Sequence, residues 1–446
     1  MASAAEQLAA SLNLGAFAKA TDLKNRIWFT LGALVIYRLG TYIPLPGVDP
    51  QVFADVFQSH SGGLLGMVDM FSGGALGRMT IFALNIMPYI SASIIIQLMQ
   101  AVSPQLEALK KEGELGRKKI NQYTRIGTVF LAAIQSYGIA VGIEGLHSSS
   151  GAAVIHPGPF FLLTAVVTMT GGTVFLMWLG EQITARGIGN GISLIIMAGI
   201  IARMPSALAA LLELGRTGAL STVFIMVVLV GAVAVITFIV FMERAHRRIL
   251  VQYPKRQVGN KMFGGEASHL PLKLNTSGVI PPIFASSLLL LPVTVVSFGS
   301  NQTGVLAEVA AYLGPGHPLY LVLYAALILF FTFFYTAIVF NPTETADNLR
   351  KYGGFIPGIR PGNNTAEYLD YVLSRLTVVG ALYLAGVCVL PEFLRSEYSV
   401  PFYFGGTSLM IVVSVTMDTV AQIHSHLLAH QYEGLIKKAK LRGGTR

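Results

Sequence analysis

The sequence predicts an all-α polytopic membrane protein with about ten transmembrane helices. Hydrophobic residues make up 53% of the 446 residues and charged residues only 12%, and the mean hydropathy is +0.62. A soluble chain of this length normally carries about a quarter of charged residues. The apolar residues also occur in blocks of roughly 20, the length of a helix that crosses a bilayer. Together these observations exclude a soluble enzyme with a large core.

The hydropathy pattern places the candidate spans along the whole chain. The first contains Arg38 and is not followed by a small-residue cleavage site, so we expect a retained span rather than a signal peptide. The fifth is the shortest and begins in the stretch GIGNG. In order, the spans are Ile27–Ile43, Ile81–Val102, Ile126–Ile143, Phe160–Ile183, Ile192–Met204, Val223–Met242, Val279–Phe298, Leu319–Phe340, Leu376–Leu390 and Phe402–Ile423.

The basic residues orient the predicted bundle. If both termini lie on one side of the membrane, that side carries 26 of the 31 Lys and Arg residues. Because positive charge is retained in the cytoplasm, we expect both termini to be cytoplasmic. The net charge of +9 is then explained by the orientation of the chain in the membrane, and it is only weak evidence of affinity for nucleic acid.

Two of the cytoplasmic loops are unusually long, at about 243–275 and 341–371, and a basic tail ends the chain. Loops of about 30 residues are uncommon without a role in binding or gating. Both combine Arg and Lys with Tyr, Phe, Gly and Pro. Anchoring charges around a turn would explain them, but a docking surface for a large cytosolic partner is favoured.

Prolines and polar side chains interrupt the second and seventh spans. Irregular backbone at membrane depth is tolerated only where it faces protein or a water-filled cavity, although a lone membrane proline can also be a simple kink. Polar groups in lipid pair across helices through weak bonds. The pattern indicates a separable seam between helices, at Pro88, Asn85, Ser91 and Gln97 in the second span, Gln135 in the third, and Asn275, Pro281, Pro282, Ser286 and Ser287 around the seventh.

Full charges are nearly absent from the span centres. Asp418 and Glu181 are exceptions, and both lie towards span ends. Ion-coupled transporters usually need such groups, so their absence argues against the alternative, a secondary transporter for a small solute with broken helices around a midplane site. A single cysteine, Cys388, allows no intrachain disulfide. We find no enzyme motif, and we expect no metal site and no cofactor.

Isoleucines recur with helical spacing in several spans. Ile86 and Ile90 share a helix face, as do Ile192 and Ile196, and others lie in the seventh and tenth spans. Spacing alone favours lipid contact or packing. If these faces converge, they form an apolar waist that excludes water and ions by dewetting.

Several long stretches then resemble one known family, SecY, whose members are the channel subunits of bacterial protein-conducting translocons. The likeness covers nearly the whole chain, with the motifs in the same order. They are FSGGALGRMTIFALNIMPYISASIIIQLM, KKEGELGRKKINQYTRIGT, FLMWLGEQITARGIGNGISLIIMAGI, VIPPIFASSLLL, FNPTETADNLRKYGGFIPGIRPG and PFYFGGTSLMIVVSVTMD.

The resemblance implies two pseudo-symmetric five-helix halves, residues 1–205 and 206–446, around an hourglass pore. It implies a plug at about 64–79, a short mobile half-helix, and a lateral gate where spans two and three face spans seven and eight. The matched pore ring is Ile86, Ile90, Ile192, Ile196, Ile283 and Ile411. The matched plug residues are Phe71, Gly73, Gly74, Leu76 and Arg78, and the matched polar residues of the gate are Gln97, Gln135 and Asn275.

The resemblance also implies a function and partners. A member of this family passes unfolded preproteins across the bacterial inner (plasma) membrane and releases transmembrane segments sideways into lipid. Its expected partners are SecE-like and SecG-like small membrane subunits, the SecA motor ATPase, the ribosome, signal sequences, nascent polypeptides and membrane lipids. Lys255, Arg256 and Arg360 match the positions that dock the ribosome and SecA. Asn85 and Pro282 depart from the family pattern.

Overall fold

The computed structural model describes residues 21–60, 69, 72–144, 147–148, 151–218, 221–253, 256–258, 261–263, 267–297, 317–398 and 406–443. Within these ranges, seven helical stretches are long and apolar enough to cross a membrane. They contain α8 (Glu114–Glu144), α9 (Pro159–Arg186), α10 (Gly191–Arg216), α11 (Thr222–Arg244), α14 (Pro318–Val339), α16 (Asn363–Tyr398) and α17 (Gly406–Gly443).

Two shorter apolar helices and one further helix account for the other predicted spans. They are α6 (Met87–Val102), α12 (Ile280–Ser297) and α3 (Thr21–Gly40). The fold class is therefore confirmed as a helical, multi-span membrane protein, while the number of spans stays a prediction. Three short helices join them: α4 (Pro50–His60), α7 (Pro104–Lys111) and α15 (Pro342–Lys351).

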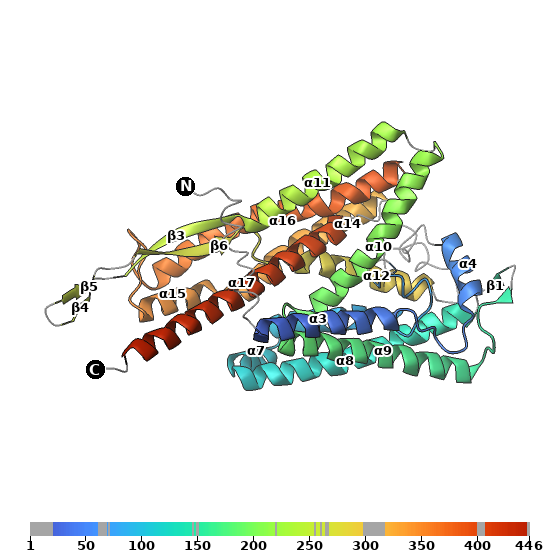
Figure 1. Ribbon diagram of the computed structural model, residues 1–446, viewed down its shortest axis with the longest axis horizontal. Coiled ribbons are helices and arrows are strands. Elements are labelled where there is room, and N and C mark those ends of the chain that lie inside the picture. The colour runs from blue at the N-terminus through green and yellow to red at the C-terminus, as the bar shows by residue number, and fades with distance from the viewer. Residues whose placement is uncertain are drawn as a thin grey trace.

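The helices pack in two groups (Figure 1). In the first, α8 packs against α6 and α9, and α9 packs against α3 and α10. In the second, α14 packs against α12 and α16, and α17 packs against α11 and α16. The predicted boundary at residue 205 falls inside α10, which continues unbroken through Pro205 to Arg216. Because α10 packs against α9 of the first group and against α17 of the second, the position of a boundary between the halves stays a prediction.

The second predicted span begins later than expected. We expected a helix from Ile81, but residues 81–86 form turns, and α6 begins at Met87 with Pro88 in its first turn. Asn85 has a positive φ of 49°, which a helix does not accept. Pro88 therefore starts the helix, where its missing N–H has no cost, and the expectation that it breaks the span is wrong.

The two long loops fold together at one end of the molecule, and α4 with β1 lies at the other end (Figure 1). Strands β3 (His246–Gln252) and β6 (Ala267–Lys273) pair in antiparallel register. Gln252 and Phe355 bridge this hairpin to the second loop through two backbone hydrogen bonds of 2.9 Å. A small core joins both loops to α16, made by Ile249, Leu272, Ile356, Leu369 and Val372.

The remaining strands are short. β1 (His147–Ser148) pairs with β2 (Gly151–Ala152), and β4 (Arg256–Val258) pairs with β5 (Lys261–Phe263), both antiparallel. They contribute hairpins to the two ends of the bundle, so helix packing carries the fold.

Candidate functional site

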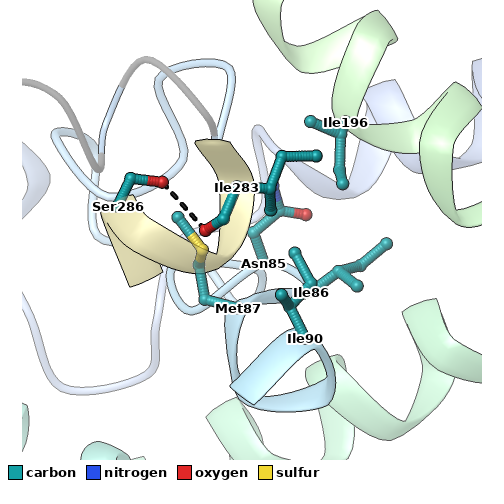
Figure 2. A pocket seen from close by; sticks show the side chains of 7 residues that line it. All are labelled: Asn85, Ile86, Met87, Ile90, Ile196, Ile283 and Ser286. Atoms are coloured by element: carbon teal, nitrogen blue, oxygen red, sulfur yellow. Dashed lines mark hydrogen bonds between the residues drawn. The ribbon is translucent and has the colours of Figure 1, made fainter. Parts of the chain in front are cut away.

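A narrow apolar pocket lies where three helices begin, and Figure 2 shows the side chains around it. Four of the six isoleucines predicted for the pore ring line it. They come from the start of α6, from α10 and from the first turn of α12. The full lining is Asn85, Ile86, Met87, Ile90, Ile196, Ile283 and Ser286.

Local sequence places these side chains. Ile86 caps the N-terminus of α6, and Ile90 lies one turn later, its N–H donating to the Ile86 carbonyl at 3.1 Å. On α10, Asn190 caps the helix by accepting from the N–H of Ile192 at 3.1 Å, which fixes the first turn. Ile196 then follows one turn later.

The isoleucines of the predicted ring are buried inside the protein. Ile86 and Ile411 are both 1% exposed, and they belong to one apolar cluster with Ile90 and Ile196. Ile192 and Ile283 are partly buried and pack against the same cluster. Of the two alternatives that spacing favoured, lipid contact is excluded for the four buried side chains, and packing between helices agrees with their burial.

Two of the residues that line the pocket, Asn85 and Ser286, have polar side chains. Ser286 Oγ donates to the Ile283 carbonyl at 3.0 Å, within the first turns of α12. Asn85 is 3% exposed, in the turn that precedes Ile86. None of the side chains that line the pocket is charged. The lining therefore offers a passing chain few directional contacts.

Within the predicted plug, Asp69 is helical and residues 72–79 form turns. Gly73 and Gly74 have positive φ angles of 66° and 87°, which end any helix at that point. A Cβ on Gly73 would lie 3.0 Å from the Cα of Gly199, so only glycine allows this approach to α10. Leu76 is 3% exposed. Phe71 lies outside the described residues, as do most residues from 61 to 71.

Arginines hold this segment in place, which sequence reasoning missed. Arg38 Nη1 donates to the Gly73 carbonyl at 2.8 Å, and Arg78 Nε donates to the Gly74 carbonyl at 3.0 Å. Arg203 on α10 forms an ion pair with Asp69, whose side chain is only 5% exposed. The sequence did contain a usable signal for these contacts. The predicted cytoplasmic face does not include Arg38, Arg78 or Arg203, so these arginines depart from the charge pattern.

Asp69 also organises the turns around it. Its Oδ1 accepts from the N–H of Gly77 at 2.6 Å, and its carbonyl accepts from the N–H of Gly74 at 2.9 Å. Asp69 therefore joins the segment 72–79 to α10, because its carboxylate binds both Gly77 and Arg203 while its main-chain carbonyl binds Gly74. We refer to Asp69 and Arg203 below as the buried ion pair.

The predicted seam is present as an interface, because α12 packs against α6 and α8. The described polar contacts at and beside this interface are weak. Ser287 Oγ donates to the Met87 sulfur at 3.9 Å, and the exposed Lys110 donates to the carbonyl of Ile338 on α14 at 3.4 Å. A thioether is a weak acceptor.

The three polar residues predicted for the gate make no described hydrogen bond across that seam. Gln97 Nε2 donates to Ser93 on its own helix at 3.1 Å. Asn275 Nδ2 donates to Glu243 on α11 at 2.6 Å, within the C-terminal helix group. Gln135 lies half-buried on α8. Their role at the gate stays a prediction.

Two of the three predicted docking residues, Arg256 and Arg360, are described, and both lie in the long loops. Arg360 is exposed, and its carbonyl accepts from Thr365 Oγ1 at 3.0 Å. Arg256 starts β4, where it pairs with Phe263 through the backbone. Lys255 lies outside the described residues.

Comparison with known proteins identifies the family. The family model of SecY matches residues 80–420. This chain belongs to the SecY family. Protein translocase subunit SecY of Rickettsia felis (strain ATCC VR-1525 / URRWXCal2) is 56% identical over 421 residues, which cover 94% of this chain and 97% of the relative. The protein of the same name from Escherichia coli (strain K12) is 55% identical over 424 residues, covering 95% and 96%.

Solved structures of SecY and Sec61 channels share the fold. One, described as showing that the plug domain of the SecY protein stabilises the closed state of the translocation channel, has a TM-score of 0.64 at 17% identity and covers 92% of this chain and 93% of that chain. Sec61 in the canine ribosome–channel complex from the endoplasmic reticulum has a TM-score of 0.61 at 15% identity, with the same coverage. The predicted SecY membership and fold are therefore confirmed.

Proposed function

We propose that this chain is the channel subunit of a protein translocase in the bacterial inner membrane, which passes unfolded preproteins and releases transmembrane segments sideways. The observation that carries the proposal is the convergence of Ile86, Ile90, Ile196 and Ile283 on one narrow pocket. The names of the SecY relatives and the titles of the similar structures support the same function. A solute transporter is not favoured.

The isoleucine ring, with Ile192 and Ile411, suits a channel that must pass many chemically different chains. Aliphatic side chains offer no directional bonds, so they release each segment as readily as they accept it. Between chains they exclude water and ions by dewetting. The energy of transport comes from the partners that push the chain, which is why we assign this subunit no catalytic role and no cofactor.

The segment 72–79 serves as the plug in this proposal. It is buried and is held by contacts to α3 and α10 that a passing chain has to break. The halves are the helix groups on either side of residues 217–221, and the α6–α12 interface is the lateral gate. A seam of apolar packing and weak polar contacts can part and close repeatedly, and Gln97, Gln135 and Asn275 then meet water or substrate when it opens.

Cross-linking tests the lateral gate. Cysteines at Met87 and Ser287, with Cys388 replaced by alanine, place two thiols where a 3.9 Å contact now joins the helix groups. Joining them with a short cross-linker should abolish the insertion of transmembrane segments, and cleaving the linker should restore it. A matched pair at Glu213 and Arg216, whose side chains form an exposed ion pair within α10, should leave insertion unchanged after the same treatment. Insertion at the normal rate through the joined pair would contradict the proposed gate.

The end formed by the long loops is the proposed docking face for the ribosome and for a SecA-like motor, through Lys255, Arg256 and Arg360. A ribosome is part of one similar channel structure. The hairpin and α15 lie together at that end (Figure 1), which supports the orientation with both termini cytoplasmic. α11 is the least buried of the seven candidate spans, at 11%, and it offers an apolar face to lipid or to SecE-like and SecG-like subunits.

Charge reversal tests the docking face. Arg360→Glu should weaken binding of ribosomes or the motor to the full-length channel by about tenfold at low salt, because a rim charge acts mainly through long-range attraction. The loss should shrink as salt is raised. Arg216→Glu, on an exposed arginine at the far end of α10, is the control and should bind normally. Equal binding by both variants in a binding assay would remove Arg360 from the interface.

A further inference from the structure

The turn GIGNG, residues 187–191 between α9 and α10, has an unusual set of hydrogen-bond partners. The N–H of Ile188 donates to Thr30 Oγ1 on α3 at 3.1 Å. The N–H of Gly189 donates to Gln422 Oε1 on α17 at 2.8 Å. The N–H of Gly191 donates to Thr184 Oγ1 on α9 at 2.9 Å. Three helices therefore bind one turn through side-chain oxygens.

The side chain of Ile188 adds an apolar wedge to these bonds. It is 3% exposed and forms a separate small cluster with Leu23 of α3. Ile27 packs on the same cluster from α3, and Ile423 and Leu427 pack on it from α17. The turn thus joins a helix of the first group to a helix of the second.

The glycines are required for this close packing. Gly189 has a φ of 87°, a conformation that other residues rarely adopt. A Cβ on Gly187 would collide with the hydroxyl of Thr30, and one on Gly191 would collide with the carbonyl of Gly180. The sequence pattern that resembles part of a nucleotide-binding loop therefore has a packing role here.

The position of this turn sets the position of two residues of the isoleucine ring. Asn190 caps α10, and Ile192 and Ile196 follow within the first two turns. A helix moves as a rigid unit over such a distance, so a shift of the turn shifts both side chains. Further along the same interface, Thr416 Oγ1 of α17 donates to the Met197 sulfur at 3.6 Å.

The two interfaces between the helix groups differ in strength. At the α6–α12 seam a described cross-group bond is a thioether contact, and beside the seam an exposed lysine of α7 reaches a carbonyl of α14. At the turn, an amide oxygen accepts a backbone N–H, and a buried isoleucine packs between α3 and α17. A force that separates the groups therefore opens the seam before it opens the turn.

We propose that the GIGNG turn is the fixed joint between the two halves. It keeps Ile192 and Ile196 in the isoleucine ring while the α6–α12 seam opens. Thr30 and Gln422 are its positioning residues, because they act on the ring only through the turn. This inference rests on the proposed role of the isoleucine ring. It assigns the selectivity of the channel partly to residues that never touch a passing chain.

The test removes both acceptor oxygens with little change in shape. The double variant Thr30→Val, Gln422→Met is compared with Thr30→Ser, Gln422→Glu, which keeps an oxygen at each position. Each full-length chain is measured in membranes for the amount assembled, and then for ion leak and for export of a preprotein with a defective signal sequence, per assembled channel. Ile86→Asn serves as the reference for a channel whose isoleucine ring is disrupted.

We expect the Val/Met variant to raise leak and defective-signal export about tenfold per channel, the factor expected when about 1.4 kcal/mol of hydrogen bonding is lost. The Ser/Glu variant should behave like the parent. A Val/Met variant that assembles less but has normal leak and selection per channel would reduce the turn to a folding role and overturn the proposal. Equal effects of both double variants would overturn it as well.

The Ile86→Asn variant distinguishes a failure of this inference from a failure of the proposed isoleucine ring. If Ile86→Asn leaks and the Val/Met variant does not, the joint is wrong and the isoleucine ring stands. If Ile86→Asn itself leaves leak and selection unchanged, the isoleucine ring is wrong, and the joint loses its function with it.

Discussion

Replacing Ile86 and Ile411 together with asparagine should make the resting channel leak ions and accept preproteins with defective signal sequences. Both side chains are 1% exposed within one apolar cluster. Each amide offers water about 1 kcal/mol of net hydrogen bonding. Two such groups stabilise the state in which water fills the isoleucine ring by about 2 kcal/mol. The population of that state should then rise about thirtyfold. Conductance of the purified channel in a planar bilayer measures this directly.

Ile95 provides a matched control for that experiment. It lies on α6 with Ile90, but 42% of it is exposed, away from the pocket. Ile95→Asn introduces the same amide into the same helix and should leave conductance at the parental level. A leak of equal size from the control, or no leak from the double variant, would remove the isoleucines from the gating role.

Breaking the buried ion pair should free the plug segment. Removal of one partner from a buried pair costs about 3–5 kcal/mol. Because Arg203 is 35% exposed, solvent screening reduces this to about 2 kcal/mol. Asp69→Asn should therefore raise the opened population of residues 72–79 about thirtyfold. The rate at which a maleimide labels a cysteine at Ala75, which is fully buried in the parent, reports that population.

The pair Arg216–Glu213 is the control for the plug experiment. Its side chains are 79% and 53% exposed, so Arg216→Gln should leave the labelling rate of the Ala75 cysteine unchanged. In the double variant Asp69→Asn, Arg203→Gln, the cysteine at Ala75 should be labelled no faster than in the faster-labelled of the two single variants. The two residues act on one contact, so their effects should not add. Parental labelling in Asp69→Asn would contradict a plug held by this pair.

Hydropathy predicted the helices well and their ends poorly. It recognises the part of a helix that is apolar enough for lipid, so the ninth span was predicted as Leu376–Leu390 although α16 runs from Asn363 to Tyr398. The fifth was predicted to end at Met204, although α10 continues to Arg216. Pro205 lies inside α10, and a membrane helix tolerates proline when neighbouring groups satisfy its backbone.

Backbone conformations at the site were beyond sequence reasoning. The continuous apolar run from Ile81 suggested one helix, whereas the chain turns at Met79 and Asn85 with positive φ angles before α6 begins. Periodicity does not record such turns, because they depend on contacts from α9 and α3. Gly73 and Gly74 were matched to a mobile plug, which stays a prediction, and the arginine contacts of this segment were not predicted.

The convergence of the isoleucines could be predicted only from the family resemblance. Spacing placed Ile86 and Ile90 on one face of a helix, but it did not say whether that face meets lipid or protein. The contacts between separate helices decide this, and no local pattern records them. The same limit explains why sequence reasoning assigned no role to GIGNG, since its partners on α3 and α17 are distant in sequence.

The isoleucine ring is tested most directly with a polypeptide that is arrested halfway through the channel. Photoreactive side chains placed singly at Ile86, Ile196 and Ile283 should each form a covalent adduct with the arrested chain, because all three line the same pocket. One placed at Ile95 should react with lipid instead. Adducts from Ile95 with none from the three pocket positions would show that the chain crosses by another route.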